Sequence, residues 1–203
     1  MKKFALILAG LILFSSSLFC QSLEDVCKII SANPITKGEY TQVKTVKSGK
    51  STRSLKSSGT FIFCTEGIMW NNLKPRKTTV IIGKDFMAQI SATGKKTVTD
   101  NSENQSFITI ASAVSSFFSN DYQALTQSFD SEISRENAGT KIALTPTDST
   151  IQAALSAIEI ILKDKDITAI TITDASGNTT AYTFTNHNYP EELSQDEKAL
   201  FAN

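Results

Sequence analysis

The stretch LKSSGTFIFCTEGIMWNNL, residues 55–73, contains the pattern on which the fold prediction rests. Its first part, residues 55–64, ends in the apolar run Phe61-Ile62-Phe63, which is typical of a strand that reaches a core. Glu66-Gly67 is a turn signal, and residues 68–73 form a second short apolar segment. Consecutive strands joined by a tight turn pair antiparallel. This stretch therefore predicts a β-hairpin.

Similar strand signals occur on both sides of this hairpin. They cover residues 38–46, 78–82, 86–91, 95–99, 129–135, 141–146, 156–163, 168–174 and 179–185. Residues 151–162 also tolerate a helix, and the period-2 spacing of Ile158, Ile160 and Leu162 favours a strand for their second half. About eleven amphipathic strands in one chain must curve strongly or close on themselves to hide their edges.

Two segments have helical spacing instead. Leu23, Val26, Cys27 and Ile30 predict an amphipathic helix that ends before Pro34. Apolar residues at helical spacing between residues 107 and 118 predict a helix inserted between the two groups of strands, with a short extension near residues 122–125. The acidic tail from residue 190 is expected to be a loop or a short helix. The fold class is therefore mainly β with helices.

The first 20 residues have the features of a signal peptide, with Lys2 and Lys3 ahead of a short apolar run. Residues 21–203 then form a single domain, which we expect in the bacterial periplasm. Cys20 leaves a second form open, in which this cysteine is acylated and anchors the protein to a membrane. Phe19 stands where lipoprotein processing prefers a small residue, so cleavage after Cys20 or Ser22 is the favoured alternative.

The composition excludes several functions. Lys and Arg together number 20, as do Asp and Glu, so the broad positive field that nucleic acids need is absent. The single histidine, His187, is expected at the surface, and the Asp164/Asp166 pair has no further ligands near it. No phosphate-binding loop, nucleophile elbow or metalloprotease motif occurs. We therefore expect a protein that is not an enzyme and needs no metal or cofactor.

Export changes how the remaining cysteines are interpreted. Cys27 and Cys64 form an even pair in a compartment that permits a disulfide between them. Two buried thiols that pack as small apolar side chains are an equally good interpretation.

The apolar side chains are the remaining candidates for function. Met and Phe suit a pocket that accepts flexible apolar ligands. Residues from the strands and from the inserted helix are expected to line a cavity or its lid, although each could also be an ordinary core residue: Tyr40, Phe61, Phe63, Met69, Trp70, Ile81, Phe86, Met87, Phe107, Phe117 and Phe118.

The order of several motifs resembles a known family. Tyr40-Thr41-Gln42 after the first helix, Gly59 to Phe63, Trp70, Pro75, Val80 to Asp85 and Ala143 to Pro146 follow the order found in the LolA-like periplasmic lipoprotein carriers. The resemblance extends from about residue 23 to residue 188. It departs at Cys64-Thr65-Glu66, where many members have an Arg-Pro pair whose arginine helps to hold the helical lid.

This resemblance implies a half-open antiparallel β-barrel whose apolar cavity is covered by a helical lid. It implies a monomeric carrier that receives acylated lipoproteins from an inner-membrane ABC-type releasing complex and delivers them to an outer-membrane acceptor. The alternative is an anchored acceptor, or an envelope lipid-binding or stress-sensing protein, with the same fold.

Overall fold

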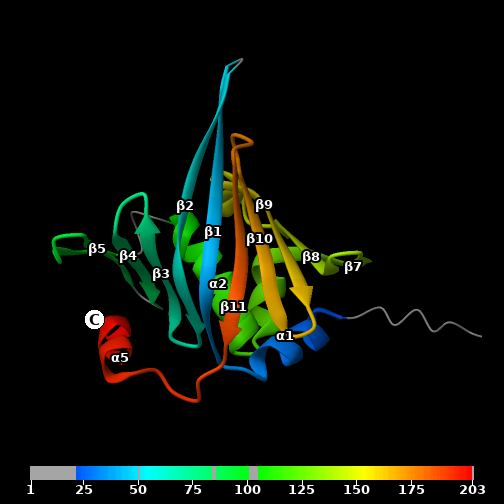
Figure 1. Cartoon of the computed structure of the whole chain (residues 1–203). Helices are drawn as coiled ribbons and strands as arrows, with labels where there is room; N and C mark the ends of the chain where they lie inside the picture. The colour runs from blue at the N-terminus through cyan, green and yellow to red at the C-terminus, as the bar shows by residue number, and fades with distance from the viewer. Residues whose placement is uncertain (1–21, 50, 84–85, 101–104, 203) are drawn as a thin grey trace, which may run out of the picture.

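The computed structural model describes residues 22–49, 51–83, 86–100 and 105–202. The eleven strands in this part of the chain form one antiparallel sheet in the order β6-β5-β4-β3-β2-β1-β11-β10-β9-β8-β7 (Figure 1). Their bounds are β1 Ile35–Ser48, β2 Ser51–Cys64, β3 Gly67–Lys74, β4 Thr78–Gly83, β5 Phe86–Ser91, β6 Lys96–Asp100, β7 Phe129–Glu136, β8 Gly139–Pro146, β9 Leu155–Lys163, β10 Asp166–Asp174 and β11 Thr179–Asn188. The helices are α1 Leu23–Ser31, α2 Gln105–Phe118, α3 Tyr122–Ser128, α4 Ser149–Gln152 and α5 Gln195–Phe201.

The sheet consists of two meanders joined at its middle. Strands β1–β6 follow one another on one side and β7–β11 on the other, and pairing of β1 with β11 connects them. The sheet is curved and open, with β6 and β7 as its described edges, and is not a closed barrel (Figure 1). This confirms the mainly β prediction with helices inserted between two groups of strands.

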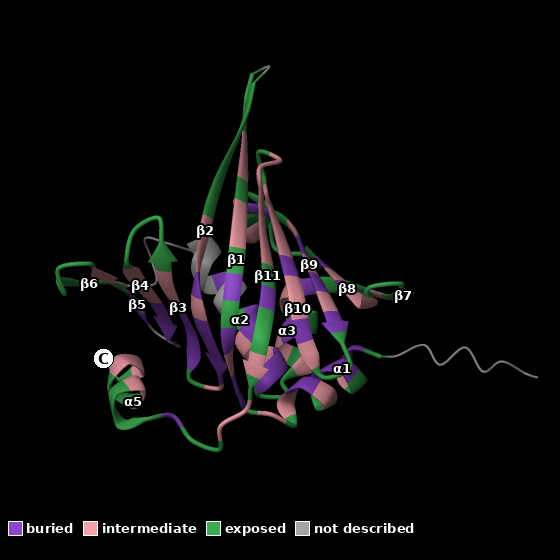
Figure 2. Cartoon of the chain, in the orientation of Figure 1, coloured by how far each residue is buried: buried purple, intermediate pink, exposed green. Residues whose placement is uncertain are grey.

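Each face of the sheet carries its own apolar cluster. The inner face is covered by α1, α2 and α3 and holds most of the buried side chains. The outer face carries a smaller cluster on β1–β5, which Leu193 and the partly buried Leu200 and Phe201 cover. Figure 2 shows the burial concentrated in the lower part of the strands, whereas the upper end of the β1–β2 hairpin is exposed.

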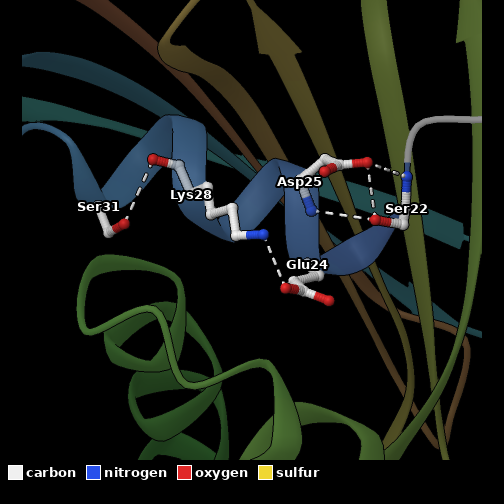
Figure 3. A network of polar contacts seen from close by, with 5 residues as sticks. All are labelled: Ser22, Glu24, Asp25, Lys28 and Ser31. Atoms are coloured by element: carbon white, nitrogen blue, oxygen red, sulfur yellow. Dashed lines mark hydrogen bonds and ion pairs between the residues drawn. The ribbon is translucent and has the colours of Figure 1, made fainter.

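Helix α1 begins at a capping box (Figure 3). The Ser22 hydroxyl accepts a hydrogen bond from the Asp25 backbone N–H at 3.1 Å, and the Asp25 carboxylate accepts one from the Ser22 N–H at 3.2 Å. The Ser22 hydrogen bonds lower the pKa of Asp25. Lys28 pairs with Glu24 at 2.7 Å on the exposed side. The opposite side of the helix is therefore free to bury Val26, Cys27 and Ile30 on the inner face.

The tail forms a helix that attaches to the outer face. Ser194 and Glu197 form a second capping box, and Lys37 of β1 pairs with Glu197 at 2.6 Å. Burial raises the pKa of Glu197, but the hydrogen bonds from Lys37 and Ser194 outweigh it and the net shift is downward. Leu193, just before α5, is buried in the outer cluster.

Three local features differ from the sequence prediction. β1 and β2 each have 14 residues, so their hairpin extends beyond its neighbours (Figure 1). The short helix α4 was not predicted as separate from the strand that follows it. His187 is not a surface residue, since its side chain is 9% exposed and its ring packs edge-on against Phe61 at 5.7 Å.

The predicted signal peptide, residues 1–20, lies outside the described residues. Within the described part of the chain, every helix is too short or too polar to cross a membrane.

Candidate ligand-binding face

Six aromatic side chains form a continuous surface on the inner face of the sheet, which we call the aromatic wall. They come from β1, β2, β3 and β11: Tyr40, Phe61, Phe63, Trp70, Tyr182 and Phe184. Strand pairing sets Phe61 opposite Trp70 and Tyr40 opposite Phe184, and paired residues share one face. Phe63 lies at the centre, with ring centroids 4.6 Å from Phe61, 5.2 Å from Phe184 and 6.1 Å from Trp70.

Helix α2 covers part of the aromatic wall. Its Phe118 ring lies 5.7 Å from that of Phe63, and Phe117 and Val114 are buried in the same cluster. Small side chains of α2 also border a pocket of about 300 Å³ that separates part of this helix from α3 and α4. The helix therefore packs tightly against the wall on one side and has free space on another.

A row of polar side chains borders the aromatic wall on its upper side, and we call it the polar band. Gln42 donates to the Tyr182 hydroxyl at 2.9 Å and accepts from the Ser57 hydroxyl. Asn72 accepts from the Tyr40 hydroxyl and donates to Thr78 at 3.1 Å. The band therefore consists of Gln42, Ser57, Asn72 and Thr78. The inner face thus changes from apolar to polar over a short distance.

Three polar groups of the aromatic wall are buried: the hydroxyls of Tyr40 and Tyr182 and the indole N–H of Trp70. Burial raises the pKa of Tyr182 to about 12 and raises that of Tyr40, so both keep their hydroxyl protons at neutral pH. The Trp70 side chain is 9% exposed, and its indole Nε1–H is buried without a described hydrogen-bond partner. An unpaired buried donor costs about 1–3 kcal/mol, so an acceptor on an incoming ligand would relieve this cost.

The predicted lining residues divide into two groups. Tyr40, Phe61, Phe63, Trp70, Phe117 and Phe118 gather in the inner cluster, and Met87 packs partly buried against it. Met69, Ile81 and Phe86 belong to the outer cluster instead, so the expectation of one cavity lined by all these strand residues is corrected. The reason is strand alternation, because Met69 neighbours Trp70 and points to the opposite face. Phe107 lies in α2, and its side chain is outside the described part.

The disulfide interpretation is wrong. Cys27 and Cys64 are both free and buried. Cys27 faces the inner cluster from α1, whereas Cys64 belongs to the outer cluster, one residue after Phe63. The sheet separates the two sulfur atoms, and the alternative of two buried thiols is what the structure contains.

The burial of both cysteines predicts that their thiols react slowly. Burial raises the pKa of Cys27 and of Cys64 to about 12 each. At pH 8 the thiolate fraction of each is then on the order of 1000-fold smaller than for an ordinary cysteine near 8.5. A protein without residues 1–20 should show two thiols to an aromatic disulfide reagent in guanidinium and almost none in buffer within minutes. Fewer than two thiols after denaturation without reductant would contradict the assignment.

The described residues contain no cluster of three or more His, Cys, Asp or Glu side chains suited to a metal ion. His187 contacts the Ile167 carbonyl at 3.0 Å, and its Nδ1 lies 3.9 Å from an Asp166 carboxylate oxygen. The sequence prediction missed the two β11 aromatics of the wall, Tyr182 and Phe184. Their alternation with Ala181, Thr183 and Thr185 was a usable signal, but only pairing with β1 places them beside Tyr40.

The model of a protein family matches most of this chain. It is the outer membrane lipoprotein carrier protein LolA, and it matches residues 35–198, a span that includes every described strand. The chain belongs to the LolA family. LolA family proteins are carriers, so membership places the chain among binding proteins. No curated protein sequence matches the chain.

The chain is also similar to solved structures at low sequence identity. One is a LolA superfamily protein from Nitrosomonas europaea, with a TM-score of 0.46 and 10% identity over 89% of this chain and 97% of that chain. Another is a chain of the MucA/MucB complex from Pseudomonas aeruginosa, with a TM-score of 0.45 and 12% identity. That match covers 86% of this chain and 59% of the Pseudomonas chain.

Proposed function

We propose that this LolA family member is a periplasmic carrier that binds the acyl chains of lipoproteins on the aromatic wall and shuttles them from the inner to the outer membrane. The observation that carries the proposal is the covered aromatic wall with the polar band at its upper border. Its apolar part suits acyl chains, and its polar border suits the ester and amide groups that join the chains to a protein.

The aromatic wall is occupied by α2 in the described state. Side chains such as Phe118 fill the place that an acyl chain would take, so binding requires the helix to move away from Phe63. The pocket of about 300 Å³ between α2, α3 and α4 gives the helix room for this movement. Trp70 Nε1–H then gains access to a carbonyl oxygen of the ligand.

Restrained affinity is a requirement of such a carrier. Burial of one CH₂ group contributes about 0.8 kcal/mol, so several fully buried acyl chains would be released too slowly for a shuttle. The contacts that α2 loses when it opens offset part of this gain. Helix α2 in its closed position therefore competes with the ligand for the aromatic wall.

Membership of the LolA family supports the proposal that other proteins load and unload the cargo. We expect an inner-membrane ABC-type complex to load the protein and an outer-membrane acceptor to receive the lipoprotein. We expect the carrier itself to act as a monomer without a cofactor or catalytic activity.

Tryptophan fluorescence tests the ligand site directly. Trp70 is the single tryptophan of the chain and belongs to the aromatic wall. Adding a diacylated peptide to the protein should shift its emission maximum and change its intensity in a saturable manner, because the ligand replaces α2 side chains near the indole. Fluorescence titration and gel filtration of the complex provide the measurement.

The same peptide without acyl chains is the matched ligand control, and it should leave the emission unchanged. Trp70→Phe should abolish the signal while the complex still elutes together in gel filtration. If the acylated peptide neither changes the fluorescence nor co-elutes, the proposal of an acyl-binding wall is wrong.

A further inference from the structure

Three strand connections lie at the same end of the sheet. In an antiparallel meander the turns alternate between the two ends, so the β1–β2, β3–β4 and β5–β6 connections share one end (Figure 1). The β1–β2 hairpin projects furthest, and Figure 2 shows the described residues near its upper end exposed. Nine described Lys and Arg side chains on or beside these connections are exposed, and we call this region the basic end: Lys44, Lys47, Arg53, Lys56, Lys74, Arg76, Lys77, Lys95 and Lys96.

None of these cations lies within ion-pair distance of a carboxylate in the described structure. None of the nine takes part in an ion pair between described residues. The sequence has no Asp or Glu from residue 40 to 65 or from 67 to 84. Asp174, which lies at this end in the β10–β11 turn, accepts hydrogen bonds from Ser176 and Asn178. Burial raises the pKa of its carboxylate, but these hydrogen bonds and the nearby charge of Lys44 outweigh it and lower the pKa. Lys44 acts on Asp174 and the Lys96 ammonium lies 5.9 Å from the centroid of the Phe86 ring, and the other seven exposed cations are directed at solvent.

The balanced overall charge conceals this asymmetry. Residues 21–203 contain 18 Lys and Arg and 20 Asp and Glu. Besides the nine cations of the basic end this segment has nine further cations, and besides Asp174 it has 19 further carboxylates. A molecule polarised in this way turns its basic end toward a negatively charged surface and its remaining surface away from it.

Two exposed leucines accompany the cations. Leu55 is 64% exposed on β2, between Arg53 and Lys56 in the neighbourhood of the hairpin tip, and Leu73 is 46% exposed beside Lys74. Seven of the nine described cations are lysines, and these connections contain no aromatic residue. Protein interfaces favour Trp, Tyr and Arg, whereas Lys with exposed aliphatic side chains is typical of attachment to the interface of an anionic membrane.

We propose that the basic end docks on an anionic phospholipid surface, with the lysines and arginines at the headgroups and Leu55 and Leu73 in the interface. Lys44 is paired with Leu55, and the next pair on the same face is Gln42 with Ser57 of the polar band. The docked membrane therefore lies beside the upper border of the aromatic wall. This docking does not depend on bound cargo and can be tested separately from the proposed function.

Vesicle binding by cargo-free protein tests the proposal. We expect sedimentation with vesicles of phosphatidylglycerol and phosphatidylcholine, no binding to pure phosphatidylcholine, and loss of binding in 0.5 M salt. Replacing Lys44, Lys47, Arg53 and Lys56 together by serine should weaken vesicle binding about 100-fold or more, since each cation contributes roughly fivefold. Leu55→Ser should weaken it about tenfold.

The matched control replaces four exposed cations elsewhere by serine, namely Lys28, Arg135, Lys163 and Lys198. This variant has the same net charge and should bind vesicles within about threefold of the unchanged protein if position matters more than net charge. Equal losses in both variants would overturn the proposal. It is also overturned if the protein binds soluble polyglutamate through the four basic-end residues but does not bind anionic vesicles, because the partner would then be an acidic polypeptide.

Discussion

Phe63→Ala is expected to lower the free energy of unfolding by about 3–5 kcal/mol. Phe63 is 1% exposed, and its ring contacts Phe61, Phe184 and Trp70 in the sheet as well as Phe118 of α2. Removing the ring takes away contacts on both sides of the sheet–helix interface at once. The surrounding strands hold the neighbouring rings in place, so the void can collapse only partly. Urea unfolding monitored by circular dichroism provides the measurement.

Leu55→Ala is the control for this variant, since Leu55 is 64% exposed and should change the free energy of unfolding by at most about 0.5 kcal/mol. The void in Phe63→Ala also lies in the wall to which we assign the acyl chain. A saturating acylated peptide should therefore stabilise this variant more than it stabilises the unchanged protein. A loss below about 1 kcal/mol would mean that Phe63 is not a central packing residue.

The arrangement of elements was predictable from local patterns. Strand alternation, turn signals such as Ser176-Gly177-Asn178 and the helical spacing that ends at Phe118 depend on neighbours in sequence, so they located the meanders and the inserted helix. The length of the β1–β2 hairpin was underestimated because its Ser- and Lys-rich tip has no apolar face. The two strands remain paired up to Ser48 and Ser51, which the apolar pattern does not reveal.

The two faces of the sheet were not predictable in the same way. Phe61-Ile62-Phe63 and Ile81-Ile82 are unbroken apolar runs, and such runs carry no period-2 signal. Both faces of these strands can carry apolar side chains because α5 and Leu193 cover the outer face of β2–β5 while α2 covers the inner face. That cover comes from a tail more than 100 residues away in the sequence. The expectation that Met69, Ile81 and Phe86 line the same cavity as the other strand residues failed for this reason.

Gly59 is the site of the second large expected effect. A Cβ atom at this position would lie 1.9 Å from the Asn71 carbonyl oxygen and 2.8 Å from the Asn71 carbonyl carbon. Both atoms belong to the backbone of β3, which cannot move aside without breaking its pairing with β2 or β4. The pairing of β2 with β3 is already irregular between Ser58 and Gly59, so glycine allows this close approach of the two strands.

We therefore expect Gly59→Ala to lower the free energy of unfolding by at least about 3 kcal/mol, at the upper end of the cost of overpacking. The effect should be concentrated in β3–β6, because these strands join the rest of the sheet through β2. Hydrogen exchange should accelerate there and leave β8–β10 nearly unchanged.

Gly49→Ala is the matched control. Gly49 has a φ of +58° but nothing within 4 Å, so this substitution should lower the free energy of unfolding by only about 1–2 kcal/mol. If the two variants were equally stable, the close contact between β2 and β3 would not limit the residue at position 59. A larger loss of unfolding free energy in Gly59→Ala would show that this close contact limits the residue. If the fluorescence of Trp70 also changes in the unliganded variant, the close approach of β2 and β3 also positions the aromatic wall.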